Sequence, residues 1–140
     1  MKHLIKFLFI AIISSNFTYA QKIKLKKGKI LVDDIEVFNY DSSKSEGWLS
    51  IYNIESGDEV IFIKEADNGT YTYQDDDYTI YKFLEQDVIV EISGYSVWKS
   101  YIKFLFKNKV FDTDGKLNDS NIETLKTKFD ENITERTIKN

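Results

Sequence analysis

The stretch FDTDGKLND carries two aspartates, a glycine and an apolar residue at spacings that occur in twelve-residue calcium-binding loops. When Gly115 is placed at position 6 of such a loop, Asp112 and Asp114 fall at the ligand positions 3 and 5. Positions 1 and 12 then fall on Val110 and Asn121, which lack the carboxylates that the loop needs. We therefore interpret the stretch as a turn between two helices, in which Asp112 and Asp114 are weak candidates for metal ligands.

Other carboxylates are candidates for acid–base catalysis, which commonly uses Asp and Glu side chains. Glu91 lies among apolar residues in VIVEIS, where burial would raise the pKa of its carboxyl group. A glycoside hydrolase needs a second carboxyl group across the scissile bond, and Glu59, Glu65 and Glu85 also lie on or near predicted strands. We expect Glu91 to face solvent from the polar side of a strand, and the acidic run at 75–77 to form a solvated turn. A carboxylate-dependent hydrolase is kept as a second alternative, with no catalytic residue assigned.

Aromatic side chains form another set of candidate binding residues. The sequence predicts Tyr71 and Tyr73 on one face of a strand, and it places Trp48 and Tyr52 in an earlier strand. Flat aromatic rings on a sheet can stack against sugars, and Tyr and Trp are common anchors at protein interfaces. Packing within the core is the competing interpretation. We take Tyr71, Tyr73, Trp48 and Tyr52 as the candidate ligand-binding residues of a carbohydrate or small-ligand binder.

The residue types that are missing exclude several kinds of catalytic site. The only histidine is His3, the only methionine is Met1, and the chain has no cysteine or proline. Beyond residue 20 the chain therefore has no histidine base and no cysteine nucleophile. It also has no imidazole or thiolate ligand for a typical zinc, copper, haem or iron–sulfur site. We expect a protein without a cofactor and, as the leading interpretation, without enzymatic activity.

Residues 1–20 have the layout of a secretory signal peptide. Lys2 and Lys6 precede the short apolar run FLFIAII, and a cleavage site is predicted after Ala20. The run is shorter than the roughly 20 apolar residues that span a bilayer, and no later segment is apolar enough to do so. We expect residues 21–140 to form one domain in the periplasm or outside the cell.

The charge balance disfavours nucleic acid as a partner. The chain has 19 basic and 23 acidic residues, which gives a net charge of −4. Proteins bind nucleic-acid phosphates through basic patches, and a net acidic surface repels these phosphates. An acidic surface instead favours solubility and basic partners.

Residues 22–93 have the pattern of an antiparallel sheet. Short runs rich in Ile, Val, Tyr and Phe alternate with turn residues, and we expect a mobile loop at 39–47. Asp33-Asp34, Gly57 and Asn68-Gly69 tolerate the left-handed conformations of tight turns. Short connections favour a meander, because parallel strands need long crossovers. The predicted strands are 22–25, 29–32, 35–40, 48–54, 59–65, 70–74, 78–85 and 88–93.

After the predicted sheet the hydrophobic period changes to three and four residues. Apolar residues at 97–106 line one face of a helix, which Ser93 or Ser96 is predicted to cap. A second helix is predicted to begin near Ser120, which has capping-box spacing to Glu123. The expected fold is α+β. It is an antiparallel meander of about six to eight short strands, flat or curled into a half-barrel, with a C-terminal helical hairpin packed on the sheet.

The string KGKILVDDIEVFNY, the hairpin after it and the string YIKFLFKNKVFDTDGKLN resemble small uncharacterised exported proteins of Gram-negative bacteria with AT-rich genomes. The likeness covers most of residues 21–140. It implies a compartment and a class of protein, and it carries over no activity and no site residue. The leading hypothesis is an exported, non-enzymatic module that acts through its surface on a protein or glycan partner in the envelope or outside the cell.

Overall fold

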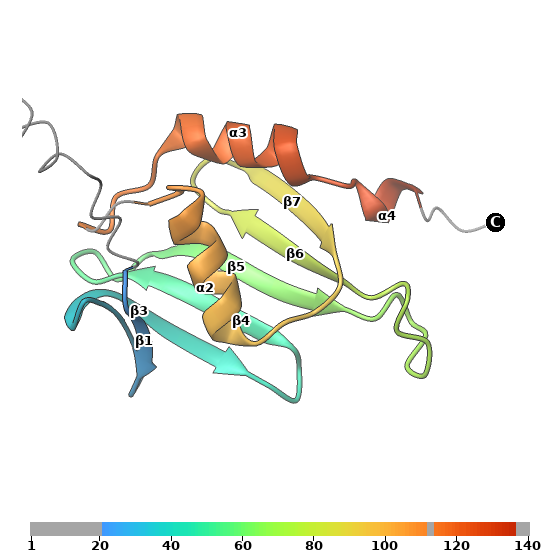
Figure 1. Ribbon diagram of the computed structural model, residues 1–140, viewed down its shortest axis with the longest axis horizontal. Coiled ribbons are helices and arrows are strands. Elements are labelled where there is room, and N and C mark those ends of the chain that lie inside the picture. Colours follow the sequence, from blue (N-terminus) through green and yellow to red (C-terminus); the bar gives the residue numbers. More distant parts are fainter. Residues whose placement is uncertain (1–20, 112–113, 137–140) are drawn as a thin grey trace, which may run out of the picture.

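The computed structural model describes residues 21–111 and 114–136, which form one antiparallel sheet with helices packed on it (Figure 1). Seven strands follow one another across the sheet in chain order, which confirms the predicted meander. Within the described residues β1 and β7 do not pair, so the sheet is open. The strands are β1 Ile23–Lys26, β2 Lys29–Val32, β3 Ile35–Ser43, β4 Trp48–Asn53, β5 Glu59–Ala66, β6 Tyr78–Phe83 and β7 Val88–Ser93.

Left-handed turn residues join several of the strands. Asp33 and Asp34 connect β2 to β3 with φ angles of 51° and 68°. Positive φ at both central positions is the geometry of a two-residue hairpin whose twist matches that of the strands. Gly57 (φ 76°) lies between β4 and β5, and Asp87 (φ 52°) lies between β6 and β7. Because Gly, Asp and Asn tolerate this region best, the turn residues set the register of the meander.

Two of the predicted β features are wrong. Residues 70–74, predicted as a strand, are turns within the connection between β5 and β6. The predicted loop at 39–47 is mostly strand, because β3 continues to Ser43, which pairs with Trp48. In residues 39–43, pairing with β4 overrides a polar sequence. In residues 70–74, no strand pairing forms although the sequence is strand-like.

The three helices of the described chain follow the sheet. They are α2 Trp98–Lys107, α3 Asp119–Phe129 and α4 Ile133–Arg136. α2 lies across one face of the sheet, α3 runs beside β7, and α4 follows α3 and also contacts β7 (Figure 1). The arrangement confirms that the C-terminal helices pack on the meander.

The start of each long helix differs from the prediction. α2 has Val97 at its N-cap and no side-chain capping bond, so neither predicted serine caps it. Val97 is 69% exposed and does not belong to the buried stripe of the helix. α3 begins after Asn118, whose side-chain oxygen accepts the Asn121 N–H at 2.9 Å. Asn is as good a capping residue as Ser, so the cap nearer the preceding turn is used.

The two faces of the sheet differ in burial. On the helix side, Tyr81 packs against Tyr101 and Phe104 of α2, with ring centroids 6.0 and 5.6 Å apart. Each fully buried Ile or Leu on this side stabilises the fold by roughly 1.5–3 kcal/mol. The opposite face carries side chains of intermediate exposure, among them Trp48 and Phe62. The buried strand residues of the helix side include Ile30, Phe38, Leu49, Ile51, Ile61, Ile63, Thr79, Tyr81, Phe83, Val88 and Val90.

The described part of the FDTDGKLND stretch, Phe111 and residues 114–119, packs against β3. Phe111 and Leu117 form an isolated antiparallel bridge, and the Phe111 ring lies 4.7 Å from the Phe38 ring. Gly115 has a φ of 78°, and a Cβ at this position would lie 3.1 Å from the Val37 carbonyl oxygen. The glycine is therefore needed both for the turn and for the close approach to β3.

Several predictions concern residues outside the described ranges. The predicted signal peptide, residues 1–20, and Asp112, one of the two weak metal-ligand candidates, lie outside them. The other candidate, Asp114, is exposed. The described residues contain no group of three or more side chains that could hold a metal ion. Among them, no helix is long and apolar enough to cross a bilayer.

The segment between α3 and α4 covers the edge of β7. The Asp130 carboxylate accepts the Glu91 N–H at 2.9 Å, and the Glu131 N–H donates to the Glu91 carbonyl at 2.8 Å. The Glu131 carboxylate accepts the Ser93 N–H at 2.9 Å and the Ser93 hydroxyl at 2.7 Å, and these bonds lower the pKa of Glu131. Because an uncovered edge strand pairs readily with other chains, these bonds protect the sheet from association.

Glu91 anchors α4 to the sheet. The expectation that Glu91 faces solvent is wrong, because it is 7% exposed. Its Oε2 accepts the Thr134 N–H at 2.7 Å, and its Oε1 accepts the Thr134 hydroxyl. The Tyr78 hydroxyl lies 3.2 Å from the same Thr134 oxygen, and Ile133 is buried beside it. A buried carboxylate with this many donors is a structural receptor for the C-terminal helix.

We expect Glu91→Ala to lower the free energy of unfolding by about 2–3 kcal/mol, because hydrogen bonds to a charged acceptor are lost. Urea denaturation monitored by tryptophan fluorescence measures the change. Glu85→Ala, at an exposed position beside β6, is the matched control and should change the value by less than about 0.5 kcal/mol. Equal losses in the two variants would contradict the anchoring role of Glu91.

Gly115→Ala tests the packing of the FDTDGKLND turn. Gly57 has almost the same φ, 76°, but a Cβ there would meet nothing within 4 Å. We expect Gly115→Ala to destabilise the protein by roughly 1–2 kcal/mol more than Gly57→Ala, because only the first adds a steric contact to the backbone strain. Urea denaturation of both variants gives the difference. A difference near zero would mean that the turn does not lie against β3.

Candidate functional site

The four predicted ligand-binding aromatics do not share one face of the sheet. Trp48 and Tyr52 alternate with buried residues of β4, so they lie on the face away from α2. Tyr71 and Tyr73 lie in the connection between β5 and β6, where their side chains are 92% and 57% exposed. The continuous tyrosine-rich sheet face expected from the sequence is therefore not formed. Among the four, Tyr71 lines a cavity and Tyr73 does not.

Trp48 is held by its neighbours. Its ring stacks on Phe62 with a centroid distance of 6.4 Å and an angle of 30° between the planes. Its indole N–H donates to the Glu46 carboxylate at 2.6 Å. The Trp48 side chain thus fixes the β3–β4 turn, and its polar atom is already engaged.

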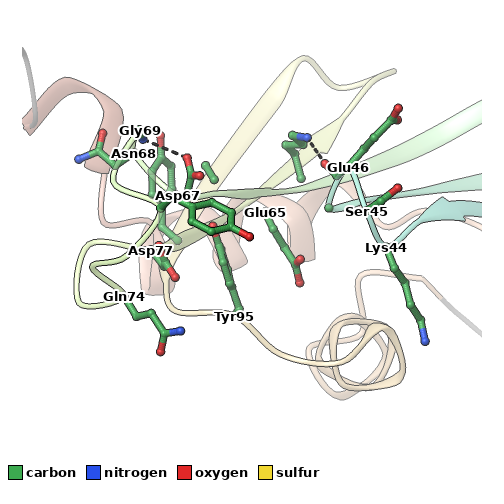
Figure 2. A pocket seen from close by; sticks show the side chains of 15 residues that line it. Lys44, Ser45, Glu46, Glu65, Asp67, Asn68, Gly69, Gln74, Asp77 and Tyr95 are labelled. Carbon is green, nitrogen blue, oxygen red and sulfur yellow. Dashed lines mark hydrogen bonds between the residues drawn. The ribbon is translucent and has the colours of Figure 1, made fainter.

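A cavity of about 810 Å³ lies at one end of the sheet, where loops from four parts of the chain meet (Figure 2). We call it the loop-end cavity. Its volume lies within the range of roughly 300–1,000 Å³ that is typical of ligand pockets. The lining comes from the β3–β4 turn, the end of β5, the β5–β6 connection and the segment after β7. It comprises residues 44–47, residues 64–69, Tyr71, Gln74, Asp77, Tyr78 and Tyr95.

Local hydrogen bonds shape the β5–β6 connection beside the cavity. The Asp67 carboxylate accepts the Gly69 N–H at 3.0 Å (Figure 2). The Thr70 hydroxyl lies 2.7 Å from the Asp76 carboxylate, which also accepts from the Asn68 amide at 3.3 Å. Such side-chain bonds compete with ladder pairing, which explains why the strand predicted here does not form. They also show that Asp76 supports the loop, whereas its neighbour Asp77 faces the cavity.

The loop-end cavity has a negative electrostatic character. Burial, followed by the nearby charges of Asp76 and Asp67, raises the pKa of the Asp77 carboxyl. Burial and the charges of Asp77, Asp67 and Glu65 raise the pKa of the Tyr95 hydroxyl. Both shifts have the direction that crowded negative charge produces. The charged residues of the lining are the carboxylates Glu46, Glu65, Asp67 and Asp77 and the lysines Lys44 and Lys64.

The Tyr101 hydroxyl connects the cavity to the core. It donates to Glu65 Oε1 at 2.7 Å and accepts the Ser96 N–H at 2.7 Å. The Thr79 hydroxyl lies 3.3 Å from the same oxygen. Tyr101 and Thr79 are 4% and 2% exposed, so this junction is shielded from water. It fixes the Glu65 carboxylate where the loop-end cavity begins, and it joins β5, β6 and the start of α2.

Sequence reasoning missed most of the cavity residues. The sequence pattern does not single out Asp67 or Tyr95, it offers Glu65 only as one of several carboxylates on or near strands, and it predicts a solvated turn for Asp77. The sequence does offer one clue for Glu65. Side chains alternate between the two faces of a strand, so Glu65 points to the same face of β5 as the buried Ile61 and Ile63. A carboxylate at a core-facing position indicates a hydrogen-bond partner or a site. For Asp67 and Tyr95 no local pattern gives such a signal, because only the folded loops bring them together.

Comparison of the chain with protein-family models, with curated protein sequences and with solved structures found no match.

We expect Tyr101→Phe to destabilise the protein by about 1–3 kcal/mol, because Glu65 and the Ser96 N–H lose a shielded partner. Tyr71→Phe, at a position that is 92% exposed, is the control and should leave stability unchanged. Urea denaturation of both variants at neutral pH measures the effect. Equal stabilities of the two variants would contradict the junction.

The pH dependence of stability provides a separate test of Tyr101. Burial raises the pKa of its hydroxyl from 10.0 to about 12, although the Thr79 and Ser96 bonds act in the opposite direction. A folded-state pKa above the unfolded value contributes stability that is present below pH 10 and is lost as the pH rises toward 12. Wild-type protein should therefore lose stability more steeply than Tyr101→Phe over this interval. If the free energy of unfolding fell equally with pH in the two proteins, the raised pKa of the buried Tyr101 hydroxyl would be contradicted.

Proposed function

We propose that the protein is an exported, non-enzymatic interaction module whose loop-end cavity receives a cationic group of a partner polypeptide. A lysine or arginine side chain is the group that fits the charge. The observation that carries the proposal is the convergence of four carboxylates and three tyrosines on one cavity. They are Glu46, Glu65, Asp67, Asp77, Tyr71, Tyr78 and Tyr95.

The physical chemistry of the lining favours a cation. Burial and then nearby negative charge disfavour the ionised form of the Asp77 carboxyl and so raise its pKa, and a positive charge entering the cavity would relieve this repulsion. Tyrosine ring faces attract ammonium and guanidinium groups, and partial desolvation strengthens that attraction. Lys44 and Lys64 offset part of the negative charge, but the Lys64 ammonium is engaged by the Glu46 carbonyl oxygen. The net charge of −4 would also steer a basic partner toward the protein.

The hydrolase alternative has less support. Both carboxylate oxygens of Glu91, its best candidate residue, accept hydrogen bonds from Thr134. A general acid or nucleophile needs an oxygen that can reach the substrate. Glu91 instead joins the C-terminal helix to the sheet, so its conformation does not suit that role.

Glycan binding is the second candidate function, and the exposure of Tyr71 favours it. The Tyr71 ring is 92% exposed at the rim of a cavity that Asn68 and Gln74 also line. A sugar can stack on such a ring and exchange hydrogen bonds with amides and carboxylates. This candidate ranks second because Trp48 and Tyr52 lie on another face and do not extend the stacking surface.

Calorimetric titration with an oligolysine peptide tests the proposal. We expect measurable binding at low salt that weakens as salt is added, because exposed charges are screened. The double variant Asp67→Asn with Asp77→Asn should bind about tenfold more weakly, since charge-assisted hydrogen bonds are lost. Asparagine at position 67 keeps a side-chain oxygen for the Gly69 N–H, so the loop should keep its conformation.

Asp75→Asn is the matched control for this titration. Asp75 belongs to the same acidic run but does not line the cavity. An equal loss of affinity in Asp75→Asn would refute cavity binding and indicate a general charge effect. Retention of a neutral oligosaccharide, lost in Tyr71→Ala but unaffected by the aspartate changes, would transfer the assignment to the glycan candidate.

A further inference from the structure

A second cavity, of about 700 Å³, lies between the start of α2 and the first strands of the sheet. We call it the α2 cavity. Lys44 and Glu65 line both this cavity and the loop-end cavity, so the two adjoin. The apolar part of its wall is formed by Leu25, Tyr40, Val97 and Trp98, and the rest of the lining is polar or charged. Small-molecule sites likewise combine apolar side chains with polar groups that fix the orientation of the ligand.

The charge of the α2 cavity is opposite to that of the loop-end cavity. Its charged lining consists of the lysines at positions 24, 44 and 99 and one carboxylate, Glu65. Lys24 pairs with Asp34, and Glu65 accepts the Tyr101 hydroxyl. Within the described ranges, the ammonium groups of Lys44 and Lys99 have no ion-pair partner. The cavity therefore presents two uncompensated positive charges to a ligand.

Uncompensated hydrogen-bond donors lie at the same place. The indole N–H of Trp98 is buried and has no acceptor among the described residues. An unpaired buried donor costs about 1–3 kcal/mol, so an acceptor supplied from outside would be favourable. α2 also begins without a side-chain cap and without an acidic residue in its first turn. The Ser100 N–H donates to the Val97 carbonyl at 2.8 Å, whereas the amides before it have no acceptor one turn earlier in the helix. The helix dipole adds positive character at this end.

We propose that the α2 cavity binds a small amphipathic carboxylate. The apolar body of the ligand lies against Leu25, Tyr40 and the Trp98 ring. Its carboxylate lies toward the start of α2, where Lys99, Lys44 and the indole N–H of Trp98 provide the positive charge and the donors. This site is separate from the proposed cation site, because Trp98 and Lys99 do not line the loop-end cavity.

NMR titration of the ¹⁵N-labelled protein with octanoate tests the inference. The chain contains two tryptophans, and Trp98→Phe assigns the indole resonance of Trp98 while keeping an aromatic wall. We expect a saturable downfield shift of the Trp98 indole N–H as it gains an acceptor. The double variant Lys44→Gln with Lys99→Gln should weaken octanoate binding about tenfold, because its charge-assisted contacts are lost.

Octan-1-ol and octylamine serve as ligand controls, and Lys103→Gln serves as the control variant. Lys103 is an exposed residue of α2 that does not line the cavity, so its replacement should leave the affinity unchanged. Octanol should bind at least about tenfold more weakly than octanoate, since it carries no charge. Octanol or octylamine binding as tightly as octanoate would overturn the proposal. So would octanoate saturation without movement of the Trp98 indole resonance, or an equal effect of Lys103→Gln.

Discussion

The hydroxyl of Tyr101 joins α2 to the sheet, and both cavities depend on that junction. One oxygen atom meets Glu65 on β5, Thr79 on β6 and the Ser96 N–H at the entry to α2. Because this atom is shielded from water, its bonds fix both the direction in which α2 starts and the position of Glu65. Glu65 lines both cavities, so the junction determines where each one begins. Glu65 lies on strand β5, which holds its side chain more firmly than a loop would.

An open meander has two edges, and this chain protects them by different means. β1 is only four residues long and carries lysines at 24 and 26, which discourage pairing with another chain. β7 is covered by Asp130 and Glu131, whose carboxylates accept N–H groups that a further strand would otherwise pair. The same segment continues to Thr134, which binds Glu91 on the outer face. The C-terminal segment thus replaces the missing neighbour of the sheet and explains why a carboxylate is buried in β7.

The parts of the fold that follow from local physics could be predicted from the sequence. Turn pairs such as Asp33-Asp34 and the change of hydrophobic period after β7 predict a meander followed by helices. The prediction fails where a tertiary contact decides between local alternatives. The strand-like residues 70–74 form turns because Thr70 bonds Asp76, and Glu91 is buried because Thr134, 43 residues later, reaches it. The loop-end cavity assembles from four separate loops, so no window of sequence contains its pattern.

The adjacency of two oppositely charged cavities has an electrostatic consequence. Lys44 and Glu65, which line both, place one positive and one negative group where the two cavities adjoin. A cation held by Asp67 and Asp77 and a carboxylate held by Lys99 would lie on either side of them and attract each other. Attraction between opposite charges near a protein surface falls with distance, so separate ligands would bind with positive coupling that is largest when the two charged groups are close. Coupling of this kind would require Tyr101 to hold Glu65 in place, because a displaced carboxylate would no longer separate the two cavities.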